Sequence, residues 1–404
     1  MNQKSVGATI ATLRKKSEMT QADLAGRLGV SDKAISRWES GQGYPDLEML
    51  PRLADLFGVS IDYILLGEKK GIAIAGNLIL DIVKSIDEYP KMGMLAQISG
   101  AFSRSVGGCA PNTAVNLAKI DPRTPITVYG KVGQDENGRF IVSELQKNGI
   151  NVSRLSYSAD VPTSFCDVMS IPSGERTFFH QRGANAQFCP EDVDTASLNC
   201  DLLHIGYLTL LDRFDAADAK YGTVMARFLH DVQSKGIKTS IDMTSNESGN
   251  YGDIVIPAMK YCNYVIINEI ECCQIFGLDA RRADGSIHED NVRLAMQKAI
   301  EAGVRDRVIV HAKECCFIMN AKGEYLCVPS LLIPPEQIKG SVGAGDAFCA
   351  GCLYGIYNDY SDKQILEFAS AAAACNLFAE NSVDGMRSKQ EILALTQHYP
   401  RRSL

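Results

Sequence analysis

The stretch GSVGAGDAFCAGCLYG at residues 340–355 combines a tight glycine turn with a run of small residues that suits a buried helix. Gly343 and Gly345 carry no Cβ, so the backbone there can adopt positive φ and approach a ligand closely. The first amides of the following helix have no partners within the helix and lie at the positive end of its dipole. The turn is therefore a candidate anion-binding site.

Asp346 is unexpected in such a turn, because its carboxylate would repel a bound anion. Its position makes sense if Asp346 is a base that takes a proton while the neighbouring amides hold the developing negative charge. The turn lacks the lysine of a GxxxxGK[ST] loop, which argues against a Walker-type nucleotide hydrolase. A structural helix start with an acidic residue in its first turn is the alternative explanation.

The segment Gly343-Ala344-Gly345-Asp346 resembles the C-terminal signature of the ribokinase-like (PfkB) carbohydrate kinases. The resemblance implies that Asp346 is the catalytic base. It also implies that the amides of Gly343, Ala344 and Gly345 form an anion hole for the transferred phosphoryl group. A sugar substrate, with ATP and Mg²⁺ as cofactors, would follow from the same resemblance.

The composition is that of a soluble globular protein with more than one domain. The chain has 404 residues, of which 46% are hydrophobic and 22% charged, and its formal net charge is −7. That length exceeds one ordinary core, and the charge argues against a protein coated in basic surface for nucleic acid. We find no apolar leader and no run approaching the roughly 18 apolar residues of a membrane span. The thirteen cysteines then favour reduced thiols and a cytoplasmic location.

Residues 4–66 predict a compact all-helical domain, because apolar residues recur there at helical spacing. Thr20 can cap a helix that begins at Gln21, and Ser31 can cap a second helix after the sharp turn at Gly29. Helix, glycine turn, helix is the geometry of a helix-turn-helix unit. A helical interaction module whose charges form an ordinary solvated face is the alternative.

The segments TQADLA (20–25), LGVS (28–31) and ISRWESG (35–41) resemble the lambda-repressor-like (XRE, Cro) DNA-binding family. The resemblance implies that the helix ending at Glu39 enters the major groove of DNA. The DNA-contacting residues that it implies are Gln21, Lys33, Ser36 and Arg37, whereas Ile35 and Trp38 are expected in the core. In residues 1–45, seven lysines and arginines outnumber four acidic residues by three.

From residue 72 onward the pattern changes to strand-like apolar runs that alternate with helical segments. Runs that are apolar on both faces occur at residues 72–76, 126–130, 202–206, 239–242, 264–268 and 308–311. Such runs indicate a mostly parallel sheet covered on both sides, with ligands bound beyond the carboxyl ends of the strands. We therefore expect an α/β fold: a doubly wound, ribokinase-like sheet with a small β lid, preceded by the all-α helix-turn-helix domain.

Two further segments resemble the sugar-binding side of the kinase family. GNLILD at 76–81 is similar to its first strand end, and GGCAPNTA at 107–114 is similar to its N-terminal signature. The sugar-contacting residues that the resemblance implies are Asn77, Asp81, Gly107, Gly108, Asn112 and Arg182. Taken alone, these residues could form an Asx-type turn, a glycine turn before a capped helix and a surface cation. By the same resemblance, segments at about 82–105 and 153–182 form a lid that excludes water.

NEIE at 268–271 fits the family's N-x-x-E motif, so Asn268 and Glu271 are expected to organise Mg²⁺ near the nucleotide phosphates. Carboxylate and amide oxygens suit a hard cation that keeps some of its waters. Asn268, Lys313 and Ser370 are the nucleotide-contacting residues that the resemblance implies. An ordinary buried alanine-rich helix is the alternative explanation of the segment around Ser370.

The chain departs from the family's pattern in three places. Gly340 and Ser341 occupy the places of the usual Asp-Thr pair, whose Asp helps relatives to bind a monovalent cation. The segment HAKECC at 311–316 lacks the usual glycines, and Cys109 stands where ribokinases proper carry lysine. These departures keep open a second function, a sugar-sensing transcription regulator in which the kinase fold mainly binds ligand.

Taken together, the patterns and the two family resemblances predict a DNA-binding domain at residues 1–67, a linker at 68–71 and a kinase domain at 72–398. The predicted activity is ATP-dependent phosphorylation of a sugar hydroxyl, coupled to sequence-specific DNA binding. We expect a cytoplasmic homodimer that makes no membrane contact. The identity of the sugar, the phosphorylated position and the operator do not follow from the sequence.

Overall fold

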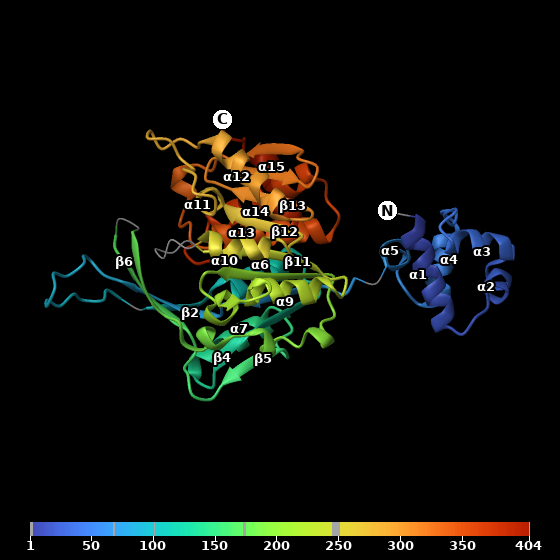
Figure 1. Ribbon diagram of the computed structural model, residues 1–404, viewed down its shortest axis with the longest axis horizontal. Coiled ribbons are helices and arrows are strands. Elements are labelled where there is room, and N and C mark those ends of the chain that lie inside the picture. Colours follow the sequence, from blue (N-terminus) through green and yellow to red (C-terminus); the bar gives the residue numbers. More distant parts are fainter. Residues whose placement is uncertain (1–2, 68, 101, 173–174, 245–250, 404) are drawn as a thin grey trace. The chain divides into compact units, whose positions relative to one another are not determined.

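The computed structural model describes residues 3–67, 69–100, 102–172, 175–244 and 251–403 (Figure 1). The chain divides into two compact units, residues 1–70 and 71–404, and each has its own hydrophobic core. All thirteen cysteines belong to the described residues of the second unit, and none forms a disulfide. Within the described ranges, no helix combines the length and the apolar character needed to cross a bilayer.

The described part of the first unit consists of short helices around one core. They are α1 (Gln3–Lys16), α2 (Gln21–Leu28), α3 (Asp32–Glu39), α4 (Met49–Phe57) and α5 (Ile61–Leu66). The Thr20 hydroxyl accepts the Asp23 N–H at the start of α2, and Gly29 ends that helix with φ 68°. Each helix contributes buried apolar side chains, among them Ile35 and Trp38 from α3.

An ion-pair network joins the first three helices. Arg14 on α1 contacts the Glu39 carboxylate at the end of α3 through two N–O distances of 2.6 and 2.9 Å. The two side chains are only 11% and 8% exposed. Gln21 Nε2, at the start of α2, donates to the same carboxylate at 2.8 Å. Glu39 therefore links α1, α2 and α3 through its carboxylate.

A nine-stranded sheet forms the centre of the second unit (Figure 1). In spatial order its strands are β15 (Tyr325–Pro329), β14 (Cys315–Asn320), β13 (Arg307–His311), β12 (Tyr264–Asn268), β11 (Lys238–Met243), β8 (Leu202–Leu208), β1 (Ile72–Gly76), β4 (Ile126–Gly133) and β5 (Leu155–Ser158). The strands from β13 to β5 are parallel, and β14 and β15 extend the sheet in antiparallel pairing. Because β1 lies between β4 and β8, the order reverses there, and ligands bind beyond the carboxyl ends of strands at such a point.

Helices cover both faces of this sheet, as strands that are apolar on both sides predict. The core on one face includes α6 (Cys109–Ile120), α13 (Ala344–Tyr357) and α14 (Asp362–Asn376). The core on the other includes α9 (Val224–Gln233), α10 (Tyr251–Met259) and α12 (Glu289–Ala302). Within β1, Ile72 and Ile74 pack into the first core, whereas Ala73 and Ala75 pack into the second, because successive side chains of a strand point to opposite faces.

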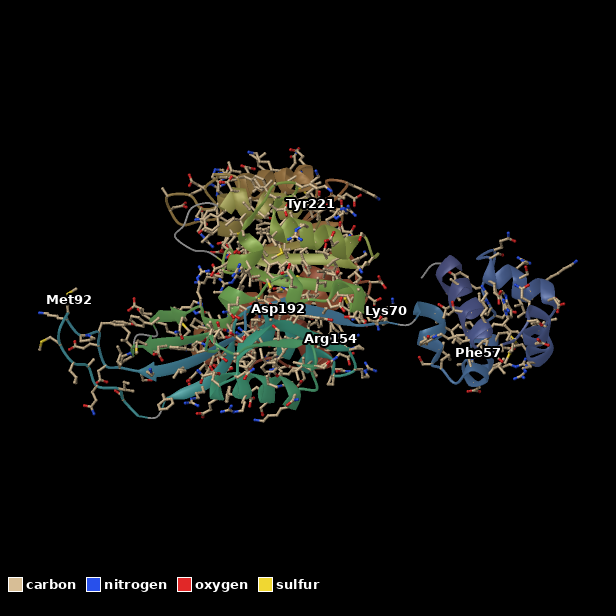
Figure 2. The ribbon with its side chains drawn as sticks, turned by 60° about the horizontal axis from the view of Figure 1, so that its bottom comes forward. Phe57, Lys70, Met92, Arg154, Asp192 and Tyr221 are labelled. Atoms are coloured by element: carbon tan, nitrogen blue, oxygen red, sulfur yellow. The ribbon has the colours of Figure 1, made fainter. Side chains whose placement is uncertain are left out.

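A smaller sheet projects from the same unit (Figure 1). Its strands, in spatial order, are β3 (Ser103–Gly107), β2 (Ile79–Ser85), β6 (Phe165–Ser170) and β7 (Arg176–Gln181). The lid was expected at about 82–105 and 153–182, and these strands overlap both ranges, although β2 begins before the first range and β3 ends beyond it. The second range was partly wrong, because β5 within it pairs with β4 in the central sheet. Met92, with its side chain fully exposed, lies at the far end of the loop that follows β2 (Figure 2).

The remaining elements complete the second unit. They are α7 (Glu136–Lys147), α8 (Asp212–Asp215), α11 (Glu269–Gln274), α15 (Lys389–His398), the short strands β9 (Ala217–Asp218) and β10 (Gly222–Thr223), and the 3-10 turns η1 (Gly183–Gln187), η2 (Pro190–Asp192), η3 (Thr195–Ser197) and η4 (Pro335–Gln337). Arg401 forms a β-bridge with Leu331, so the chain stays packed beyond residue 398, where the kinase domain was predicted to end.

Candidate functional site

The glycine turn lies at the start of α13, beyond the carboxyl ends of the central strands. Gly343 has φ 77° and ψ 4°, and a Cβ added to it would lie 2.4 Å from the Cβ of Ser382. Both the left-handed backbone and the lack of space therefore require glycine at this position. Gly343, Gly345 and Asp346 line a cavity of about 160 Å³.

Asp346, in the first turn of α13, is 6% exposed and holds two hydrogen bonds. Asn112 Nδ2 on α6 donates to Oδ2 at 2.9 Å, and the Tyr207 hydroxyl lies 3.3 Å from each carboxylate oxygen. Burial and the nearby Asp242 carboxylate raise the pKa of Asp346 to about 8, although both hydrogen bonds act to lower it. A carboxyl group that titrates near neutral pH is suited to general base catalysis.

A network of buried polar side chains fixes the carboxyl ends of β8 and β11. Asp242 Oδ1 accepts the N–H of Tyr207 at 2.5 Å, and Oδ2 lies 3.4 Å from His204 Nε2. His204 is fully buried; its Nδ1 lies 3.1 Å from the Ser240 hydroxyl, and its Nε2 lies 3.6 Å from the Cys349 thiol of α13. These contacts fix the position of Tyr207, near the end of β8, relative to α13.

The expected sugar-contacting residues gather around the glycine turn before α6. A Cβ added to Gly107 would lie 2.2 Å from the Asp81 carboxylate, and one added to Gly108 would lie 2.5 Å from the Asn77 carbonyl oxygen. Burial raises the pKa of Asp81 to about 6. Among the described residues, the buried Asn77 Nδ2 and Asn112 Oδ1 have no hydrogen-bond partner. Buried polar atoms of this kind are expected where a ligand supplies the partner.

Arg182 is placed differently from the other expected sugar contacts. It forms an ion pair with Asp212 on α8, and its side chain is 40% exposed. Nearby, Asn185 hydrogen-bonds both backbone groups of Leu78, at 3.1 and 3.0 Å, and so braces the turn after β1. Contact between Arg182 and a sugar stays a prediction.

The expected nucleotide contacts Lys313 and Ser370 line one cavity of about 550 Å³. His311 and Gly345 line both this cavity and the smaller one beside Asp346, so the two meet at the glycine turn. Burial lowers the pKa of His311 to about 4, and its neutral ring packs 5.0 Å from the ring of Phe348. The volume lies within the range of ligand pockets, about 300–1,000 Å³.

Asn268 and Glu271 cap the N-terminus of α11 reciprocally. Asn268 Oδ1 accepts the Glu271 N–H at 2.8 Å, and Glu271 Oε2 accepts the Asn268 N–H at 3.0 Å. Both residues line the small cavity together with Asp242 and Asp346. The Glu271 carboxylate and the Asn268 amide oxygen fit a hard divalent cation such as Mg²⁺.

The expected DNA-contacting residues divide into two groups. Lys33, Ser36 and Arg37 are exposed on α3. Gln21 is only partly exposed, and its amide is held by Glu39. The exposed group has the positive charge and the access that contacts to a nucleic acid require.

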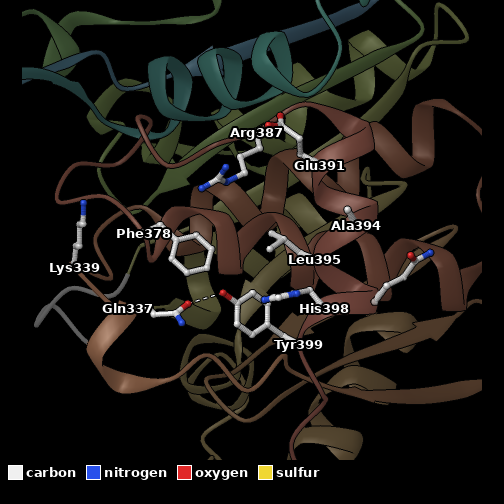
Figure 3. Close-up of a pocket in the computed structure, with 10 residues that line it drawn as sticks. Gln337, Lys339, Phe378, Arg387, Glu391, Ala394, Leu395, His398 and Tyr399 are labelled. Atoms are coloured by element: carbon white, nitrogen blue, oxygen red, sulfur yellow. Dashed lines mark hydrogen bonds between the residues drawn. The ribbon is translucent and has the colours of Figure 1, made fainter.

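A further cavity of about 810 Å³ lies between η4, α15 and the end of α14 (Figure 3). In it the Tyr399 hydroxyl donates to Gln337 Oε1 at 2.5 Å, and the Arg387 guanidinium lies 5.7 Å from the centre of the Phe378 ring. It shares no lining residue with the cavities at the glycine turn. We therefore do not include it in the candidate active site.

Two residues of this site were not among those expected to act. Asp242 ends an apolar strand, and that position is a usable signal, because the carboxyl ends of parallel strands face the ligand. Tyr207 lies in no recognisable sequence motif, because it simply follows the apolar run at residues 202–206. Its contact with Asp346 spans 139 residues of sequence, and no local pattern reports it.

Comparisons with known proteins match each unit of the chain to a family. Residues 72–389 match the pfkB family of carbohydrate kinases, and residues 10–64 match a helix-turn-helix family. A 5-dehydro-2-deoxygluconokinase of Geobacillus thermodenitrificans is 23% identical over 74% of this chain and 86% of its own length. A ribokinase of Schizosaccharomyces pombe is 25% identical over 80% of this chain and 96% of its own.

Solved structures share the fold of the second unit. Arabidopsis thaliana ribokinase complexed with ribose and ATP has a TM-score of 0.68 and 20% identity, covering 81% of this chain and 99% of that one. A nucleoside kinase of Methanocaldococcus jannaschii has a TM-score of 0.64 and 18% identity, covering 82% and 99%. An E. coli protein described as a ribokinase II, in complex with ATP and Mg²⁺, has a TM-score of 0.64 and 17% identity, covering 81% and 99%.

Proposed function

The chain belongs to the pfkB family of carbohydrate kinases, and from this premise we propose that it phosphorylates a sugar hydroxyl with ATP. The observation that carries the proposal is the position of Asp346. Its buried carboxylate lies at the N-terminus of α13 and is hydrogen-bonded to Asn112, on the helix that begins at the expected sugar-binding turn. One carboxylate thus connects the anion-binding turn with the sugar side.

The reaction would follow the general course of phosphoryl transfer. Asp346 takes the proton of the sugar hydroxyl, whose oxygen forms a bond to the γ-phosphorus of ATP while the bond from that phosphorus to the β–γ bridging oxygen breaks and ADP leaves. The amides of Gly343, Ala344 and Gly345 stabilise the charge on the transferred group. General-base help contributes about 10²–10⁴ in rate, so positioning and charge stabilisation supply the rest.

The remaining side chains bind the reactants. The sugar would contact Asn77, Asp81, Gly107, Gly108, Asn112 and Arg182 beneath the small sheet. Lys313 and Ser370 would contact the nucleotide in the 550 Å³ cavity, with Asn268 at the phosphate end. Glu271 and Asn268 would hold Mg²⁺, which when bound neutralises charge on the nucleotide phosphates.

For the first unit, we propose sequence-specific DNA binding through α3. Lys33, Ser36 and Arg37 would reach the bases and phosphates, and Gln21 would help to position α3 through Glu39. A homodimer would bind two half-sites about 34 Å apart along the DNA. Selection from a pool of random DNA duplexes, followed by sedimentation of the complex, tests both points. An enriched sequence without two-fold symmetry, or a monomeric complex, would contradict the dimer.

ATP turnover by the purified protein, measured against a panel of sugars and nucleosides, tests the kinase function. We expect sugar-dependent release of ADP by the wild type and its collapse in Asp346→Asn. Absence of turnover with every acceptor would contradict the proposal.

A sugar sensor is the second candidate, and the replacement of the family's Asp-Thr pair by Gly340 and Ser341 favours it. A sensor would show no turnover, yet a sugar would raise the melting temperature of the wild type and of Asp346→Asn alike. DNA binding with and without that sugar would then show whether occupancy of the kinase fold controls the first unit.

A further inference from the structure

Tyr207 has a backbone conformation that bulky residues rarely adopt. It is the next-to-last residue of β8 and has φ 61°, in the left-handed region. A non-glycine residue persists in this conformation only where its surroundings impose it. Here the surroundings are the Asp242 carboxylate, which accepts the Tyr207 N–H at 2.5 Å, and Thr209, also left-handed at φ 80°, whose hydroxyl donates to the Thr244 carbonyl at 2.9 Å. Such strain is typical of functional sites.

The hydroxyl of Tyr207 contacts both oxygens of the Asp346 carboxylate. Its oxygen is 3.3 Å from both Oδ1 and Oδ2, while Asn112 approaches Oδ2 at 2.9 Å. Tyr207 lines the small cavity together with Gly343 and Gly345. A hydroxyl that gives its proton to Asp346 must come within roughly 2.6–3.2 Å of one of these oxygens. Because the phenol contacts both oxygens and Asn112 contacts one of them, an acceptor hydroxyl that reaches Asp346 from this cavity competes with the phenol.

We propose that Tyr207 closes the acceptor position of the sugar-free enzyme: its hydroxyl occupies the place of the sugar hydroxyl at Asp346 and keeps water out of it. The inference rests on the proposed kinase function. Water in that place would be activated by Asp346 and would attack ATP, giving ADP and inorganic phosphate in place of sugar phosphate. An arriving sugar hydroxyl displaces the phenol and takes over its hydrogen bond to the Asp346 carboxylate.

The pH dependence of the enzyme distinguishes a displaced phenol from one that stays. The ionisable groups that act on Asp346 are Asp242 of β11, Asp81 of β2, Cys109 of α6 and Cys349 of α13. The hydrogen bond from Tyr207 lowers the pKa of Asp346, so its removal raises that pKa in the free enzyme. In the sugar complex the phenol has already been displaced from Asp346, so the substitution should not change the pKa of Asp346 in that complex.

The experiment compares the wild type with Tyr207→Phe, which keeps the ring, and with Tyr157→Phe, which removes a phenol that is 51% exposed on β5. Because the sugar hydroxyl no longer has to displace the phenol, Tyr207→Phe should bind the sugar roughly tenfold more tightly in calorimetry. Its sugar-independent ATP hydrolysis should rise several-fold relative to sugar phosphorylation. Tyr157→Phe should match the wild type in both.

The pH profiles complete the test, because kcat/KM reports the free enzyme and kcat reports the substrate complex. In Tyr207→Phe, the acidic limb of the pH profile of kcat/KM should move to higher pH. The acidic limb of the pH profile of kcat should remain at the pH of the wild type. Equal movement of both limbs, or a fall in kcat without extra ATP hydrolysis, would show that the phenol remains at Asp346 during the reaction, which overturns the inference alone. A wild type that phosphorylates no sugar would overturn the kinase function and this inference together.

Discussion

Glu39 in the first unit and Asp346 in the second are both shielded carboxylates that receive two donors, and their charge states differ. Burial alone would raise the pKa of Glu39, but hydrogen bonds from Arg14 and Gln21 hold it below its usual value. Asp346 has a neutral amide and a phenol as donors, and burial with a second carboxylate nearby raises its pKa to about 8. A cationic partner makes a carboxylate a fixed structural charge, whereas neutral partners leave it able to exchange a proton.

The two units also differ in where the residues proposed to bind partners lie. Lys33, Ser36 and Arg37 are exposed on α3, because a surface that meets DNA must reach its groove and phosphates. Asp346 and Asn112 are buried, because phosphoryl transfer to a sugar requires that water be excluded. Substitutions in the two sets should therefore affect one activity each.

The largest effect is expected from Asp346→Asn. Replacing the carboxylate with an amide of the same shape removes the base and should lower kcat for sugar phosphorylation about 10²–10⁴-fold. DNA affinity should not change. Steady-state assays with the sugar substrate and a DNA-binding titration check both statements, and a variant that keeps more than a tenth of the wild-type kcat would rule out Asp346 as the base.

Glu39→Ala should destabilise the first unit without reducing kinase turnover. Arg14 and Gln21 lose their common partner, and an unsatisfied hydrogen bond to a charged group costs about 1.5–3 kcal/mol. Chemical denaturation followed by the fluorescence of Trp38, the single tryptophan of the chain, reports this unit selectively. Glu48→Ala, at an exposed position that makes no capping bond, is the matched control. Equal stability of the two variants would mean that Glu39 does not hold the helices together.

Arg37→Ala should weaken specific DNA binding by about 1–3 kcal/mol, or roughly 5–150-fold, and leave the stability of the first unit unchanged. Arg37 is exposed on α3 and has no role in the core. Arg52→Ala, exposed on α4, provides a control of equal charge. Titrations at one fixed salt concentration compare the three proteins. If both variants lose affinity equally, the contribution is general charge and α3 is not the recognition helix.

The smallest effect, about tenfold between pH 7 and the plateau above pH 8, is the dependence of kcat/KM on pH. The active form of Asp346 is the carboxylate, and a pKa of about 8 leaves roughly one tenth of it ionised at pH 7. The value of kcat/KM should therefore rise about tenfold per pH unit below pH 8 and level off above it. A profile from about pH 6 to pH 9 at constant ionic strength measures this rise, which a limb centred near pH 4 would contradict.

Local features of the sequence predicted much of the fold. The caps at Thr20 and Ser31, the turn at Gly29 and the runs that became β1 and β12 depend on neighbours within a few residues. The glycine turn before Asp346 is of the same kind, since its backbone is set by Gly343 itself. Such patterns are legible because the interactions that they encode are short-range.

What the sequence by itself determined is therefore the order of its two parts, the doubly wound sheet and the turn that carries Asp346. The tertiary structure alone decided what surrounds that carboxylate: Asn112 from 234 residues away, Tyr207 from 139 residues away, and the burial that raises its pKa. These contacts arise where the N-terminus of α6 and the carboxyl end of β8 meet the N-terminus of α13. This arrangement depends on the order of the strands in the whole sheet, so no single segment of the chain predicts it.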